Sequence, residues 1–228
     1  MFDFLKRKAE SKTKYMHIAI DTKGVEKWSD KNRLSLVDGY QKSFSRIKEM
    51  MQVQIGKKVP ILSLLILPLK QERRMELLKE FNEFINKEDF WKHLRENKIK
   101  VTVLGQWYDL PSEIIGNLKC LIEGTKDYDN FFLNFCLNYD GQEELVDAIK
   151  LINRQVLANK LSPQNITKDT IKENLYTSYF IPPDLVIKNS ESLIDSFFLW
   201  DCVGAKRHFT EREFPDFGRD DFEKVLSQ

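Results

Sequence analysis

The chain has 228 residues, of which 42% are hydrophobic, and this length favours a single domain with one large buried core. Its 36 lysines and arginines balance 35 aspartates and glutamates, so no charge excess indicates nucleic acid or an anionic membrane as the main partner. The longest apolar run, 61–69, is interrupted by Ser63 and Pro68 and is well short of the roughly 20 residues that cross a bilayer. We expect a cytoplasmic protein without a nucleic-acid partner, either free or peripheral to a membrane.

The first 14 residues differ from the rest of the chain. Phe2, Phe4 and Leu5 are followed by five basic residues, and no apolar stretch is long enough for a signal peptide. We therefore predict a basic N-terminal segment, 1–14, before a single domain, 15–228. The three cysteines lack the spacing of a metal site or a disulfide framework, so we expect buried thiols at Cys120, Cys136 and Cys202.

Short apolar segments alternate with amphipathic ones along the domain. Strands are expected at 16–20, 59–67, 99–104, 131–137 and 184–187. Helices are expected at 34–53, 72–96, 111–122, 141–157 and 220–226. Strand–helix units in series predict a mostly parallel sheet with helices on both faces, because parallel neighbours need crossover connections.

In such a sheet, ligands bind beyond the carboxyl ends of the strands. A functional site is therefore expected in the segments that follow the strands, namely 21–27, 67–71, 105–109, 138–142 and 188–195.

Several sequence blocks resemble those of the cis-prenyltransferases, the family that includes undecaprenyl diphosphate synthase. Segment 17–28 (HIAIDTKGVEKW) is similar to the family's H-x-A-I-I-M-D-G-N-x-R-W. Segment 137–148 (LNYDGQEELVDA) is similar to N-Y-G-G-R-x-(D/E)-I-x-x-A. The closing blocks P-D-L-V-I-R, S-N-F-L-L-W and W-P-D-F have counterparts at 183–188, 196–200 and 214–217. The blocks keep the family's order and spacing from about residue 15 to the end.

The resemblance implies a single α/β domain with a mostly parallel central sheet of about six strands flanked by helices. In the family, the Asp-Gly turn after the first strand and the next helix N-terminus hold the diphosphate of an allylic primer with Mg²⁺, as suits a helix N-terminus. A second site holds isopentenyl diphosphate, a hydrophobic tunnel houses the growing chain, and the proteins are typically dimers. Transferred to this chain, the diphosphate-binding residues would be Lys23, Gly24, Lys27, Arg33 and Tyr40. The pocket residues would be Trp28, Asn138 and Lys188.

The first site departs from the family pattern. The essential Asp of the Asp-Gly turn is Lys23 here, and the Arg before Trp28 is Lys27, which keeps the charge but loses the bidentate fork. The family His is Tyr40, and a further family Arg is absent although Arg33 lies nearby.

The second site departs as well. The Arg-x-Ser that binds isopentenyl diphosphate in the family aligns with 193–195 (LID), and a Mg²⁺-binding Glu aligns with Lys206. A leucine cannot bind a diphosphate and an aspartate repels it. Ordinary chain elongation by this chain alone is therefore not expected.

Two interpretations of the turn stay open. Asp21 lies two residues before Lys23 and on the same side of the strand end, so it is either a replacement catalytic and Mg²⁺-binding carboxylate or a structural partner of Lys23 or Lys27. Lys23 and Lys27 either hold a diphosphate as point charges or are solvated turn lysines.

Two functions follow from these interpretations. The first is a non-catalytic subunit that supports a catalytic cis-prenyltransferase. The second is an enzyme of changed chemistry that binds one prenyl diphosphate and ionises or cyclises it, as a terpene synthase does, without isopentenyl diphosphate. Mg²⁺ is a cofactor only in the second case. In both cases we expect a homodimer, or a heterodimer with a catalytic chain, formed through 195–217.

Overall fold

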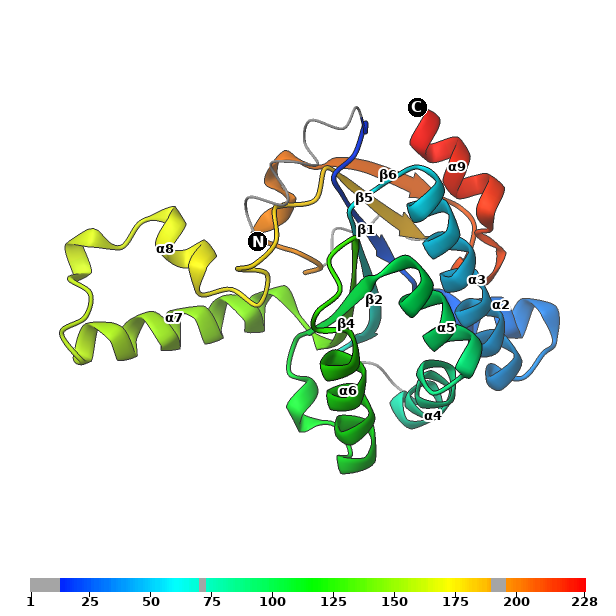
Figure 1. The fold of residues 1–228 in the computed structure, drawn as a ribbon, viewed down its shortest axis with the longest axis horizontal. Helices are drawn as coiled ribbons and strands as arrows, with labels where there is room; N and C mark the ends of the chain where they lie inside the picture. Colours follow the sequence, from blue (N-terminus) through cyan, green and yellow to red (C-terminus); the bar gives the residue numbers. More distant parts are fainter. Residues whose placement is uncertain (1–12, 70–72, 190–195) are drawn as a thin grey trace.

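The computed structural model describes residues 13–69, 73–189 and 196–228. In these ranges the chain forms a sheet of six parallel strands in the order β3-β4-β2-β1-β5-β6 (Figure 1). The strands are β1 His17–Asp21, β2 Ile61–Pro68, β3 Ile99–Leu104, β4 Phe131–Tyr139, β5 Leu185–Asn189 and β6 Lys206–Thr210. The expected α/β fold with about six strands is confirmed.

Helices surround this sheet and account for most of the remaining described chain. They are α2 Val25–Asn32, α3 Leu36–Gly56, α4 Arg74–Ile85, α5 Glu88–Asn97, α6 Ser112–Thr125, α7 Gly141–Leu157, α8 Lys168–Glu173 and α9 Arg219–Ser227. Most of them lie against the body of the sheet, whereas α7 and α8 project away from it (Figure 1). None of these described helices is long and apolar enough to cross a membrane.

The inner strands β1, β2, β4 and β5 bury both of their faces, as expected for parallel strands. Alternate residues point to opposite sides, so Ile18 and Ile20 join one apolar cluster while Ala19 joins another. The larger cluster is covered by α3, α4, α5, α6 and α9. The smaller one is covered by aromatic residues from the chain around β5, namely Phe180, Phe197 and Phe198. The sheet is therefore fixed from both sides.

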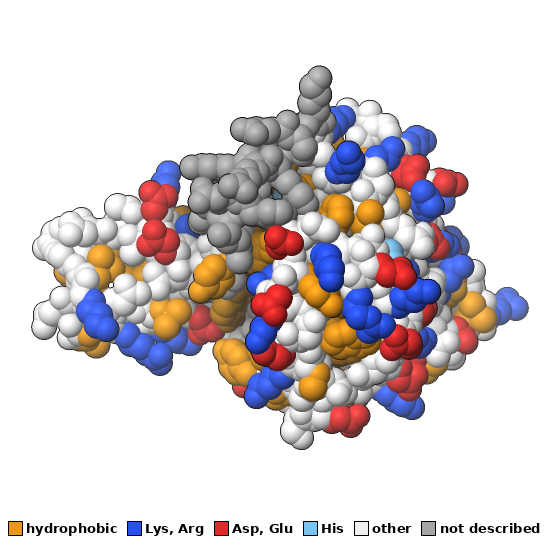
Figure 2. All heavy atoms as spheres, in the orientation of Figure 1, with side chains coloured by type: hydrophobic (Ala, Val, Ile, Leu, Met, Phe, Trp, Pro, Cys, Tyr) orange, Lys and Arg blue, Asp and Glu red, His pale blue; other side chains and the backbone are white. Residues whose placement is uncertain are grey.

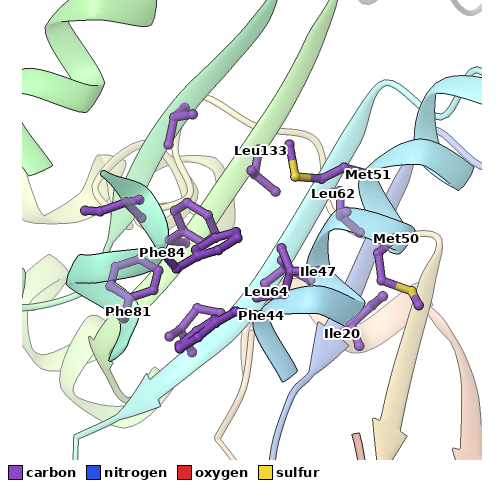
Figure 3. Packing of buried hydrophobic residues seen from close by; sticks show 14 of the residues in the cluster. Ile20, Phe44, Ile47, Met50, Met51, Leu62, Leu64, Phe81, Phe84 and Leu133 are labelled. Atoms are coloured by element: carbon purple, nitrogen blue, oxygen red, sulfur yellow. The ribbon is translucent and has the colours of Figure 1, made fainter. Parts of the chain in front are cut away.

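The larger cluster is densely aromatic. Phe44 of α3 stacks on Phe84 of α4 with ring centroids 5.1 Å apart, and Phe81 meets Phe135 of β4 edge-to-face at 5.1 Å. Figure 3 shows Phe44, Phe81 and Phe84 gathered on one side of the close-up, and Met50 of α3 beside Ile20 of β1. These side chains belong to one buried apolar cluster between helices and sheet, where the resemblance implies a hydrophobic tunnel.

The prediction of a single helix over 72–96 is wrong, because the helix is interrupted between α4 and α5. Asn86 ends α4 by donating from its side chain to the Asn82 carbonyl at 2.8 Å, and Lys87 is extended. Glu88 and Asp89 then start α5, where carboxylates favour the helix N-terminus. The break turns Phe84 and Phe90 toward each other, with ring centroids 4.7 Å apart.

Helices α2 and α8 and strand β6 were not predicted. Helix α2 is short, and it is separated from α3 by a capping box in which Ser35 and Asp38 exchange hydrogen bonds. Strand β6 lies at the edge of the sheet and is largely exposed, so its charged sequence lacks the apolar pattern of a buried strand.

Cys136 and Cys202 are buried as expected, whereas Cys120 is exposed on the outer face of α6.

His17 is a structural histidine at the start of β1. Its Nδ1 donates to the Ile181 carbonyl at 2.6 Å, so its Nε2 accepts from the Ser63 hydroxyl at 2.8 Å. The Asn134 amide donates to the same hydroxyl at 3.0 Å. Burial lowers the pKa of His17 to about 4, which keeps the ring neutral.

A buried carboxylate connects α7 to the sheet. Glu144 is 2% exposed, accepts from the Tyr139 hydroxyl at 2.5 Å and accepts from the Thr177 main-chain N–H at 3.3 Å. Burial raises the pKa of Glu144 to about 7; the Tyr139 hydrogen bond opposes this rise and the charge of Asp201 adds to it.

Glu144→Gln should therefore remove a pH dependence of stability. The folded protein binds the Glu144 proton more tightly than the unfolded chain, whose carboxyl has a pKa of 4.5, so the wild-type free energy of unfolding decreases as pH rises from 4.5 to about 7. Because glutamine does not ionise, the stability of the variant relative to wild type should rise by about 2–3 kcal/mol over that range.

Urea unfolding at a series of pH values measures this difference. Glu143→Gln, at the partly exposed neighbouring position, is the matched control and should follow the wild-type pH dependence. A Glu144→Gln curve that runs parallel to wild type at every pH would contradict the prediction.

Candidate functional site

The turn between β1 and α2 is held in place by side-chain hydrogen bonds. The Thr22 hydroxyl donates to the Leu65 carbonyl at 2.6 Å, which ties the end of β1 to β2. The Lys23 main-chain N–H donates to Asp21 Oδ1 at 3.1 Å. Gly24 then takes a left-handed conformation with φ 97°, which glycine adopts without strain, and α2 starts at the next residue.

Both lysines of this turn are paired with buried carboxylates. Lys23 Nζ lies 3.5 Å from Asp21 Oδ2, and Lys27 Nζ lies 2.8 Å from Glu213 Oε1. The Asp21 and Glu213 side chains are only 5% and 8% exposed, against 39% and 65% for the two lysines. The lysines therefore cover the carboxylates on their solvent side.

Glu213 was not predicted as a site residue. It lies just before the short 3-10 helix Phe214–Asp216, whose Phe214 main-chain N–H donates to the Lys23 carbonyl at 3.4 Å. A Cβ atom placed on Gly24 would lie 1.8 Å from Glu213 Oε2, so the carboxylate lies directly against the glycine. Oε2 is buried and has no hydrogen-bond partner in the part of the chain that the structure describes. The only sequence hint was its place next to the Phe-Pro-Asp-Phe block.

Two predicted residues lie buried behind the turn. The Tyr40 hydroxyl and the Trp28 indole N–H are both without a hydrogen-bond partner among the described residues. Burial raises the pKa of Tyr40 to about 12.

A small cavity lies next to Gly24. Its lining includes Thr22 and Val25 on either side of the glycine, with Tyr40, Phe44 and Phe214. Its volume is about 20 Å³, enough for a single water, whereas small-molecule sites usually measure roughly 300–1,000 Å³.

The other predicted site residues lie apart from the turn. Arg33 is exposed at the far end of α2, about 12 Å along the axis of this helix. Asn138, at the end of β4, donates to the Gln106 carbonyl at 3.0 Å and accepts from Arg74 at 3.2 Å. Lys188 is buried in β5, and Lys206 is exposed in β6. Segment 193–195 lies outside the described residues.

The residues around the turn do not fit a Mg²⁺ site. Both Asp21 oxygens interact with Lys23, one Glu213 oxygen is paired with Lys27, and Lys23 itself replaces a carboxylate with an ammonium group. Mg²⁺ prefers an octahedral set of oxygen ligands, usually with one or two carboxylates and substrate phosphates. No cluster of three or more histidine, cysteine, aspartate or glutamate side chains with metal-site geometry occurs among the described residues.

Gly24→Ala should destabilise the protein by about 1–2 kcal/mol, because alanine is strained at a φ of 97° and its Cβ would displace Glu213. Gly116→Ala is the matched control. Gly116 lies in α6 with nothing within 4 Å of an added Cβ, so alanine there should stabilise the protein by about 0.5–1 kcal/mol through its higher helix propensity. Urea unfolding measures both changes, and equal effects of the two substitutions would contradict this description of the turn.

Comparison with known proteins identifies similar chains. The undecaprenyl diphosphate synthase family model matches residues 22–228. The isoprenyl transferase of Clostridium perfringens is 30% identical over 216 residues, which cover 92% of this chain and 85% of that protein. The isoprenyl transferase of Oceanobacillus iheyensis is 27% identical over 218 residues, which cover 93% and 86%.

Among solved structures, lavandulyl diphosphate synthase from Lavandula x intermedia, in complex with dimethylallyl diphosphate, superposes with a TM-score of 0.90. The match covers 95% of both chains at 22% identity, so it shows a shared fold.

Proposed function

The chain belongs to the undecaprenyl diphosphate synthase family, and we propose that within prenyl diphosphate metabolism it is a non-catalytic subunit of a catalytic cis-prenyltransferase. The observation that carries this proposal is that both cations of the first turn, Lys23 and Lys27, are already paired with carboxylates of the chain itself. The cationic turn has little positive charge left for a diphosphate.

Binding a diphosphate at this turn would carry an electrostatic penalty. If Lys23 and Lys27 moved toward the ligand, the buried carboxylates of Asp21 and Glu213 would lose their ion pairs, which costs more than breaking an exposed ion pair. The same two carboxylates would also repel the phosphate oxygens. The described residues around the turn offer no Mg²⁺ site that would offset this repulsion.

The apolar side of the turn also supports the proposal. A prenyl tail that follows its diphosphate would have to enter the region where Phe44, Phe81 and Phe84 pack (Figure 3). The cavity next to Gly24 offers only about 20 Å³. Interiors packed like this one do not accept extra methylene groups without strain.

A subunit role also requires a surface for a partner. The projecting helix α7 exposes Val146, Ile149 and Leu157, the last two at 61% and 74%. Figure 2 shows hydrophobic side chains on the surface of the projecting region that α7 and α8 form. In the described part of 195–217, Val203 is 88% exposed and Phe209 is 45% exposed. Exposed apolar side chains on a projecting helix support a protein–protein interface, in a homodimer or in a heterodimer with a catalytic chain.

The second candidate is an enzyme that binds one prenyl diphosphate and ionises or cyclises it. The observation that favours it is the TM-score of 0.90 with lavandulyl diphosphate synthase, a protein solved with dimethylallyl diphosphate bound. In that case Mg²⁺ would be required, with Asp21 as the catalytic carboxylate and Lys23 and Lys27 as diphosphate ligands. The ion pairs of the turn weigh against this candidate.

Calorimetric titration with dimethylallyl and farnesyl diphosphate in the presence of Mg²⁺ separates the two candidates. The wild-type chain and Lys23→Ala should both show no saturable binding. Saturable binding that Lys23→Ala weakens by about 1–3 kcal/mol would support the enzyme and refute the subunit.

A second assay tests for the partner: it measures elongation of farnesyl diphosphate by a catalytic cis-prenyltransferase from the same source. Addition of the wild-type chain should increase this activity, and Ile149→Asp should abolish the increase by placing a charge in the apolar surface of α7. Met75→Asp is the matched control, because Met75 is equally exposed at 60% but lies on α4. No effect of the wild-type chain on any such enzyme would refute the subunit role.

A further inference from the structure

Glu213 lies where a bound anion would be expected at the N-terminus of α2. The first main-chain N–H groups of a helix have no partner within the helix, and the helix dipole adds positive potential there. The N-cap residue of α2 is Gly24, which has no side chain to cap the helix. Gly24 leaves this end open by lacking a Cβ atom, and Lys27 adds a cation in the first turn.

The carboxylate fills this position from a distant part of the sequence. Glu213 Oε1 forms an ion pair with the Lys27 ammonium at 2.8 Å. Glu213 Oε2 is buried, has no hydrogen-bond partner among the described residues and lies against Gly24. Glu213 is 7% exposed, and one of its carboxylate oxygens is unpaired. The carboxylate therefore needs the positive end of α2 to offset the hydration that it has lost.

The backbone around Glu213 prevents the carboxylate from moving away easily. The Asp216 and Phe217 main-chain N–H groups donate to the Glu213 carbonyl at 2.9 and 3.2 Å. Phe214 and Phe217 are both fully buried in the larger apolar cluster. The Glu213 side chain is thus held over α2 by a well-anchored turn.

We propose that Glu213 is a built-in anion that blocks an otherwise complete anion-binding site, formed by the N-terminus of α2, Gly24 and Lys27. This inference rests on the proposed function, because it explains why a member of the family would fail to bind a diphosphate. Removal of the Glu213 charge takes away the carboxylate that is paired with Lys27 and lies against Gly24, and an external diphosphate group then takes that place.

The test is calorimetric titration of inorganic pyrophosphate, without Mg²⁺, into the full-length chain and its variants. Glu213→Ala, which removes the carboxylate and opens space, should bind pyrophosphate about tenfold or more tightly than wild type, the effect of one charge-assisted contact. Glu213→Gln keeps the shape without the charge and should give a smaller gain. Adding Lys27→Ala to Glu213→Ala should abolish the gain.

Glu211→Ala is the matched control, since Glu211 is exposed two residues earlier and its removal should leave pyrophosphate binding as in wild type. Thermal unfolding verifies that each variant is folded; if Glu213→Ala is not, the isosteric Glu213→Gln decides. The inference is overturned if folded Glu213→Gln and Glu213→Ala bind no more tightly than wild type, or if Glu211→Ala gives the same gain. Failure of the proposed function looks different, because the wild-type chain itself would then bind a prenyl diphosphate.

Discussion

The rest of the site depends on one electrostatic constraint, which is that a buried carboxylate must be compensated. Glu213 is nearly excluded from water, and it is compensated by the Lys27 ammonium and by the positive end of α2. This requirement explains why residue 24 is a glycine, since any Cβ there would collide with Oε2. It also explains why Lys27, although mostly exposed, points back to the protein instead of into solvent.

The scaffold around this interaction is that of a parallel α/β sheet buried on both faces. Strands β1 and β2 place the turn at the carboxyl edge of the sheet, and the Thr22 hydrogen bond to β2 fixes it there. The aromatic packing of α3 and α4 on the sheet then closes the apolar side of the turn. The family architecture is therefore kept, while both lysines of the turn are paired with carboxylates of the chain.

Much of the fold was predictable because its main determinants are local or follow from the alternation of strands and helices. The strand at 99–104 and the helix at 141–157 were predicted with the observed bounds, since each carries a strong apolar period. Strand β6 and helix α2 were not, because an exposed edge strand and an eight-residue helix carry little apolar pattern. At the site, the sequence identified Asp21, Lys23, Gly24 and Lys27 but not Glu213. Glu213 reaches Gly24 and Lys27 only through the tertiary structure, and no local sequence pattern encodes that contact.

The most direct test of this account is a crystal structure of the wild-type chain grown with a saturating concentration of dimethylallyl diphosphate and Mg²⁺. The account predicts that the Glu213 carboxylate remains against Gly24 and paired with Lys27, and that no diphosphate density is present at the N-terminus of α2. Diphosphate at that position, with Lys27 on its phosphate oxygens and Glu213 displaced, would contradict the account.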